Sequence, residues 1–191
     1  MAKQFPEIDE KQAAFIGRQK IFFTASSAGD SHVNLSPRST EHLHLLGPNE
    51  VAYLDLTGSG SETAAHVKAG GRLTIMLCAF EGPPLILRLY GRGRIAFRGS
   101  PAYDAFLERH CPAGEPLGAR QIVFLDVDLV QTSCGYGVPL FDHAGERNVL
   151  DRWAMAKGEE GLVAYRREKN VESLDGLPTG LPIDESLSGS Y

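Results

Sequence analysis

The stretch RLTIMLCAFEGPPLILRLYGRGRIAF, residues 72–97, places two apolar runs one after the other with no helix between them. The runs 72–80 and 85–97 are separated by Gly and Pro, which is typical of two strands joined by a turn. Gly91 and Gly93 interrupt the second run. Glycine inside a strand often marks a bend at a barrel corner, so this stretch predicts a curved sheet.

The rest of the chain supplies further strands that also follow one another without regular helical crossovers. We expect strands at 21–25, 32–36, 49–57 and 121–131, and helices at 9–20, 61–71, 100–110 and 146–157. This order favours a mainly β fold with flanking helices, an antiparallel β-barrel rather than a doubly wound sheet. We expect one domain over 1–172. The Gly-, Pro- and Ser-rich segment 173–191 is expected to be an extended or flexible tail.

The composition argues against several kinds of partner and site. The chain has 191 residues, a net charge of -5 and three widely spaced cysteines. This charge argues against nucleic acid and anionic membranes as partners. The cysteines form no disulfide or metal pattern, and His42 and His44 lack a third metal ligand nearby. The first residues show no apolar signal segment, so the expected location is the cytoplasm.

The segment LDLTGSGSETAAHV, residues 54–67, reads as a strand, a turn and a helix. Such a turn can aim free backbone N–H groups at one point, which suits a phosphate. The segment taken alone favours a plainer interpretation, in which Ser59 caps the helix and Glu62 closes a capping box.

Two other strands carry polar groups on one face. In the segment 32–39, Asn34, Ser36 and Arg38 alternate onto one face, and Pro37 indicates a strand end or a sheet edge. This face could hold the polar edge of a heterocycle and an anion, or it could be the wet face of a hairpin. In the run 85–97, Arg88 shares a face with two further arginines. It could bind phosphate oxygens or belong to a solvated outer face.

The order of these segments resembles that of the pyridoxamine 5'-phosphate oxidase-like family, whose members are FMN-binding split barrels. The resemblance covers about residues 10–130 and lies in the run of NLSPR, LDLTGSGSETAAHV, RLTIMLCAF and LILRLYGRGRI. It implies a split antiparallel β-barrel of the FMN-binding type. It further implies a homodimer with FMN at the subunit interface.

By this resemblance, the flavin ring would lie along the hairpin strand, and the next strand and helix would contact both ring and phosphate. The implied cofactor-binding residues are Asn34, Leu35, Ser36, Arg38, Leu56, Thr57, Ser61, Glu62, Thr63 and Arg88. The chain departs from the oxidase at Glu62 and Thr63, where the oxidase has an Arg-Lys pair. An anion beside a phosphate is unfavourable, so Arg38 and Arg88 would have to supply the positive charge, Glu62 would have to turn away, or FMN is not the ligand.

The sequence therefore predicts an FMN-dependent oxidoreductase acting on a small molecule of unknown identity. A reduced nicotinamide is the expected electron source, and no catalytic residue is assigned because the flavin performs the chemistry. Two alternatives stay open. One is a non-catalytic split-barrel module that binds flavin, deazaflavin or haem, and the other is an interaction protein that lost its ligand.

Overall fold

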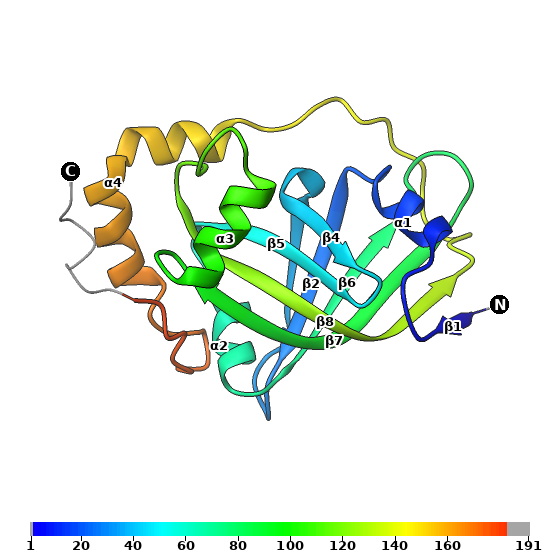
Figure 1. Cartoon of the computed structure of the whole chain (residues 1–191), viewed down its shortest axis with the longest axis horizontal. Coiled ribbons are helices and arrows are strands. Elements are labelled where there is room, and N and C mark those ends of the chain that lie inside the picture. Colours follow the sequence, from blue (N-terminus) through cyan, green and yellow to red (C-terminus); the bar gives the residue numbers. More distant parts are fainter. Residues whose placement is uncertain (1, 183–191) are drawn as a thin grey trace.

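The computed structural model describes residues 2–182 and shows a curled antiparallel sheet with flanking helices (Figure 1). The strands follow the order β3-β2-β6-β7-β8-β5-β4, and β1 pairs with β8 outside this path. Their bounds are β1 Lys3–Phe5, β2 Ile21–Ser27, β3 Asn34–Ser39, β4 Leu43–Gly47, β5 Glu50–Leu56, β6 Arg72–Cys78, β7 Ile86–Phe97 and β8 Ala119–Ser133. Since β3 and β4 are the two edges, the barrel is split between them. The predicted split antiparallel barrel is confirmed.

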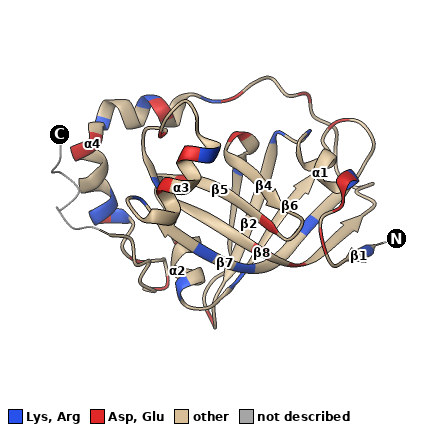
Figure 2. Ribbon diagram, viewed as in Figure 1, with Lys and Arg blue, Asp and Glu red and all other residues tan. Residues whose placement is uncertain are grey.

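The helices lie around this sheet (Figure 1). They are α1 Glu10–Ile16, α2 Glu62–Lys68, the 3-10 helix η1 Thr40–His42, α3 Pro101–His110 and α4 Val149–Lys169. A segment of 134–148 without helix or strand leads from β8 to α4. Both α3 and α4 carry acidic and basic side chains (Figure 2). None of the helices described is long and apolar enough to cross a membrane.

The long strand β7 bends where the glycines predicted a bend. Its register with β8 shifts between Tyr90 and Gly91. A Cβ atom added to Gly91 would lie only 1.9 Å from the carbonyl oxygen of Asp126. Only glycine therefore allows the two backbones to approach each other here, which explains its position inside an otherwise regular strand.

Two hydrophobic clusters lie on opposite faces of the sheet. The larger one fills the inside of the curl and includes the fully buried Phe22, Tyr53 and Leu89. The smaller one joins the outer face of β5, β7 and β8 to Phe106 and other side chains of α3. The outer side of β3 has no such cover among residues 2–182. Leu35 there is 64% exposed.

Several elements differ from the expected ones. Strands β1 and β4 were not predicted, and the strand expected at 32–36 runs over Asn34–Ser39. Pro37 lies in an edge strand, as expected. Within the segment expected to be a tail, Ser173, Thr179 and Leu181 are buried, whereas 183–191 lie outside the described residues.

Candidate functional site

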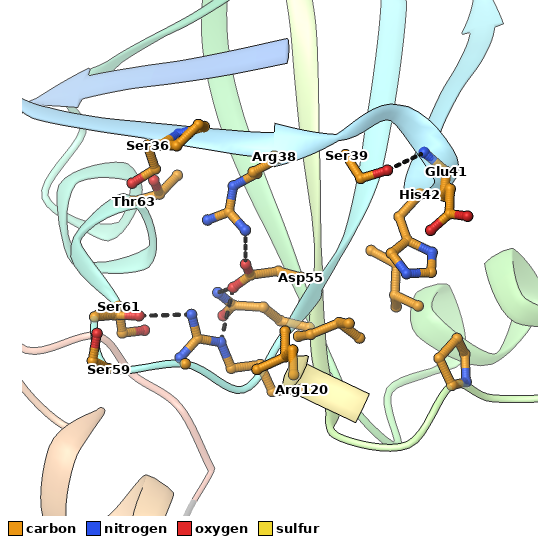
Figure 3. A pocket seen from close by; sticks show the side chains of 18 of the residues that line it. Ser36, Arg38, Ser39, Glu41, His42, Asp55, Ser59, Ser61, Thr63 and Arg120 are labelled. Carbon is orange, nitrogen blue, oxygen red and sulfur yellow. Dashed lines mark hydrogen bonds and ion pairs between the residues drawn. The ribbon is translucent and has the colours of Figure 1, made fainter. Parts of the chain in front are cut away.

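A cavity of about 870 Å³, lined by both polar and apolar side chains, opens where the edges of the barrel fail to meet. Strand β3 forms one wall and the end of β5 another, and the start of α2 and residues of 146–155 complete it. Figure 3 shows Ser36 and Arg38 on one side of this space and Asp55, Ser61 and Arg120 across from them. The split of the barrel therefore creates the site.

A buried ion cluster spans this opening (Figure 3). The carboxylate of Asp55 accepts hydrogen bonds from Arg38 Nη1 at 2.5 Å, Arg120 Nε at 2.8 Å and Gln121 Nε2 at 2.7 Å. Asp55 is 1% exposed and Arg120 is 3% exposed. The guanidinium of Arg38 also lies over the ring of Tyr53, 4.8 Å from its centroid. The three charged groups sum to one positive charge in the cavity wall.

The same charges control the ionisation of Asp55. Burial by itself would raise the pKa of this carboxyl group. The positive charges of Arg120 and Arg38, with hydrogen bonds from Arg120 and Gln121, outweigh burial and lower the pKa of Asp55 to about 2. The cluster is therefore fully ionised at neutral pH.

Arg120 also joins the cluster to the loop of residues 58–61, here called the glycine loop. Its Nη2 donates to the carbonyl oxygen of Gly60 at 2.7 Å, and its Nη1 donates to Asn170 Oδ1 at 2.8 Å. Asn170 Nδ2 in turn donates to the carbonyl oxygen of Gly58 at 3.0 Å. The loop is thus held from two sides by side chains that come from distant parts of the chain.

The start of α2 differs from the capping box that the sequence suggested. The residue before the helix is Ser61, and its side chain makes no capping hydrogen bond. The prediction that Ser59 caps the helix and that Glu62 closes the box is wrong. Glu62 instead accepts a hydrogen bond from the backbone N–H of Leu174, with its two oxygens at 3.2 and 3.1 Å. Ser61 Oγ lines the cavity, is buried and has no hydrogen-bond partner in the described chain.

The structure brings most of the predicted site residues together. Those that line the cavity are Asn34, Ser36, Arg38, Leu56, Ser61, Glu62 and Thr63. Asn34 Nδ2 donates to Thr63 Oγ1 at 3.3 Å, which joins β3 to α2.

The other three predicted residues lie elsewhere. Leu35 is on the outer side of β3, and Thr57 is buried with its hydroxyl donating to the carbonyl of Gly118 at 2.8 Å. Arg88 does not line the cavity; it lies on β7, where its Nη1 donates to Ser133 Oγ at 3.4 Å. In a single chain Arg88 therefore adds no charge to the cavity.

Sequence reasoning missed Asp55, Arg120, Gln121 and Asn170. A usable signal existed for the first two, because each is a charged residue beside a run of apolar residues in a predicted strand segment, VAYLDL and ARQIVFL. A charge in such a place needs a partner of opposite sign. Asn170 gave no signal, since it follows a helix in a polar segment.

The fold and the site define the class of protein: a split antiparallel barrel with a cavity beside its edge strand β3. Comparison with known proteins identifies the family. The family model described as pyridoxamine 5'-phosphate oxidase matches residues 8–134. The pyridoxamine 5'-phosphate oxidase family protein ustO of Aspergillus flavus is 36% identical, over 84% of this chain and 71% of its own. The chain belongs to the pyridoxamine 5'-phosphate oxidase-like family.

Solved structures show the same fold. HupZ from Group A Streptococcus matches with a TM-score of 0.51 and 15% identity, over 64% of this chain and 91% of its own. A pyridoxamine 5'-phosphate oxidase-related, FMN-binding protein from Nostoc punctiforme matches with a TM-score of 0.50 and 11% identity, over 68% of this chain and 85% of its own. At these identities the likeness concerns the fold alone.

Proposed function

We propose that the chain is an FMN-binding flavoprotein and acts as an oxidoreductase on a small molecule. The observation that carries this proposal is the buried, unpartnered hydroxyl of Ser61, which lines the cavity close to the positive Arg38–Asp55–Arg120 cluster. A buried polar atom without a partner is costly unless a ligand or water satisfies it. A phosphate oxygen would do so, and the positive charge of the cluster would favour it.

The rest of the cavity fits a flavin. Its volume lies within the range of small-molecule sites, roughly 300–1,000 Å³. Asn34 and Ser36 offer polar groups along β3, and Leu56 and Leu117 offer apolar surface. When bound, the flavin would supply the transfer of a hydride or of single electrons. The protein's part would be to orient the ring and to hold the phosphate.

The acidic residue at the helix start does not oppose this proposal. The Glu62 carboxylate is bound to the backbone N–H of Leu174, so its charge is partly compensated by the C-terminal segment. The positive charge comes from Arg38 and Arg120 in place of the oxidase's basic pair. The family resemblance and the FMN-binding Nostoc relative support the choice of FMN.

A second candidate ligand is haem, which one observation favours. The imidazole of His42 lines the cavity and makes no hydrogen bond to the described residues. A histidine nitrogen is a common axial ligand of haem iron. Such a protein would carry or sense its ligand without the proposed reaction.

Titration with FMN tests the proposal directly. We expect wild-type protein to bind FMN, seen as a shifted flavin absorption spectrum, quenched fluorescence and a higher melting temperature. Ser61→Ala should weaken FMN binding about tenfold or more, because a hydrogen bond to a charged group contributes about 1.5–3 kcal/mol. Ser27→Ala, on β2 and outside the cavity, serves as the matched control. A Soret band from added haem with no response to FMN would favour the second candidate, and no response to either would defeat both.

We also propose that two copies form a homodimer that uses the outer side of β3. Leu35 on this side of β3 is 64% exposed, and Val33, which directly precedes β3, is 70% exposed. Exposed apolar side chains beside a binding cavity are typical of an interface. A two-fold interface would build two equal sites and could bring Arg88 of one copy near the cavity of the other.

Sedimentation equilibrium measures this association. We expect a mass about twice the 20.7 kDa of one chain. Leu35→Glu should raise the dimer dissociation constant roughly 100-fold, because it places an unpaired carboxylate in an apolar contact. Leu45→Glu, on the opposite edge strand β4, should leave it unchanged. A wild-type monomer at high concentration would contradict the proposal.

A further inference from the structure

Asn170 lies at the end of α4, yet its side chain reaches the glycine loop. It is fully buried and bonded on three sides. Its Nδ2 donates to the carbonyl of Gly58, its Oδ1 accepts from Arg120 Nη1, and its own carbonyl accepts from Thr179 Oγ1 at 2.7 Å. The contacts fix both ends of its amide group, so it cannot rotate without breaking them.

These contacts determine which way the peptide groups of the loop face. In a trans peptide the C=O of one residue and the N–H of the next point in opposite directions, and the described chain has no cis peptide bond. With the Gly58 carbonyl held by Asn170, the N–H of Ser59 points away from Asn170. With the Gly60 carbonyl held by Arg120, the N–H of Ser61 points away from Arg120.

Both serines line the cavity, and neither of these N–H groups has an acceptor among residues 2–182. Together with the unpartnered Ser61 Oγ, the loop has three donors without a partner in the described chain, whereas the carbonyl oxygens of Gly58 and Gly60 already accept hydrogen bonds. Backbone donors grouped in this way suit an anion with several oxygens.

We propose that Asn170 is a positioning residue that, with Arg120, orients the glycine loop to receive a phosphate and so makes the cavity prefer a phosphorylated flavin to an unphosphorylated one. This inference rests on the proposed function. Asn170 lies outside the residues 8–134 matched by the family model, so the C-terminal part of this chain supplies the contact. It also explains how the site can do without a basic pair at the helix start.

The test compares the affinities for FMN and for riboflavin, which differ only in the phosphate. We expect Asn170→Ala to weaken FMN binding about tenfold while riboflavin binding changes less than about twofold, since about 1.4 kcal/mol of phosphate contacts is lost. The control is Ser173→Ala in the same C-terminal segment. Its hydroxyl oxygen accepts from the N–H groups of Asp175 and Leu177 and does not touch the loop. This control should keep the wild-type ratio of the two affinities.

Equal losses for both flavins would show that Asn170 only supports the fold and would overturn the inference while the proposed function stands. A wild-type protein that binds neither flavin would defeat the proposed function itself. If Asn170→Ala does not fold, the NMR chemical shifts of amide protons in the wild-type protein test the inference instead. Ser59 and Ser61 should shift strongly downfield with FMN or inorganic phosphate and little with riboflavin; unchanged shifts with FMN bound would overturn the inference.

Discussion

Replacing Asp55 with Asn is expected to destabilise the protein by about 3–5 kcal/mol, because it leaves the buried Arg120 and the partly buried Arg38 without their counter-charge. Arg38 and Arg120 both bond to this carboxylate, and Arg120 is almost completely inaccessible. Such a loss is a large part of the total stability of a domain, about 5–15 kcal/mol. Urea unfolding of the wild-type and variant proteins, followed by circular dichroism, measures it.

Asp126→Asn is the matched control, because its carboxylate pairs with Arg94 on the surface, where both side chains are about half exposed. An exposed pair contributes roughly 0–1 kcal/mol. If Asp55→Asn costs no more than Asp126→Asn, the cluster does not stabilise the link from β3 to β5 and β8.

Lowering the pH should reduce the stability of the protein through protonation of Asp55. The pKa of Asp55 is lowered to about 2 in the folded chain, from about 3.9 in an unfolded one. Its contribution to stability is therefore complete above pH ~3.9 and is lost as the pH falls toward the folded value. Over this range the Asp55→Asn variant should lose less stability than the wild-type protein.

Replacing Gly91 with Ala is expected to cost about 3 kcal/mol or more, the upper end for an overpacked site. The new Cβ would lie 1.9 Å from the Asp126 carbonyl oxygen and 2.9 Å from Leu125 Cδ1. The first contact is with backbone, so no change of rotamer can relieve it, and β7 would have to separate from β8. The melting temperature and the yield of soluble protein report the effect.

Gly47→Ala provides the comparison for this prediction. Gly47 also lies at a register shift, between β4 and β5, but a Cβ there would meet nothing within 4 Å. Its substitution should change the stability by less than about 0.5 kcal/mol. If Gly91→Ala and Gly47→Ala change the stability by similar amounts, β7 and β8 can move apart at the bend to accommodate the added methyl group.

The elements with strong local patterns were predictable. The alternation of β7 and its bending glycines, the edge position of Pro37 and the polar face of β3 are set by neighbours in sequence. Strand β4 was missed because LHLLG is short and lies between a turn of helix and the Gly47-Pro48 turn. Strand β1 was missed because it has only three residues and pairs with β8, the last strand in the sequence.

The site was predictable only in its local parts. Asn34, Ser36 and Arg38 follow from one strand, and the glycine loop follows from its composition. The contacts that organise them join residues far apart: Asp55 and Arg120 are 65 positions apart, and Asn170 and Gly58 are 112 apart. No local pattern encodes such a pairing. For the same reason the expected capping box gave way to the contact of Glu62 with Leu174.

The hydrogen bond from Asn170 to the glycine loop also determines when, during synthesis of the chain, the site can take its final form. A chain grows from its N-terminus during translation, and its early parts can begin to fold before the later ones exist. Every strand of the described sheet ends by Ser133, so the ribosome has added all the barrel's segments well before it adds the residue that fixes the loop. All strands of the barrel therefore precede the residue that orients the loop, so the cavity can take its final form only after α4 has been made.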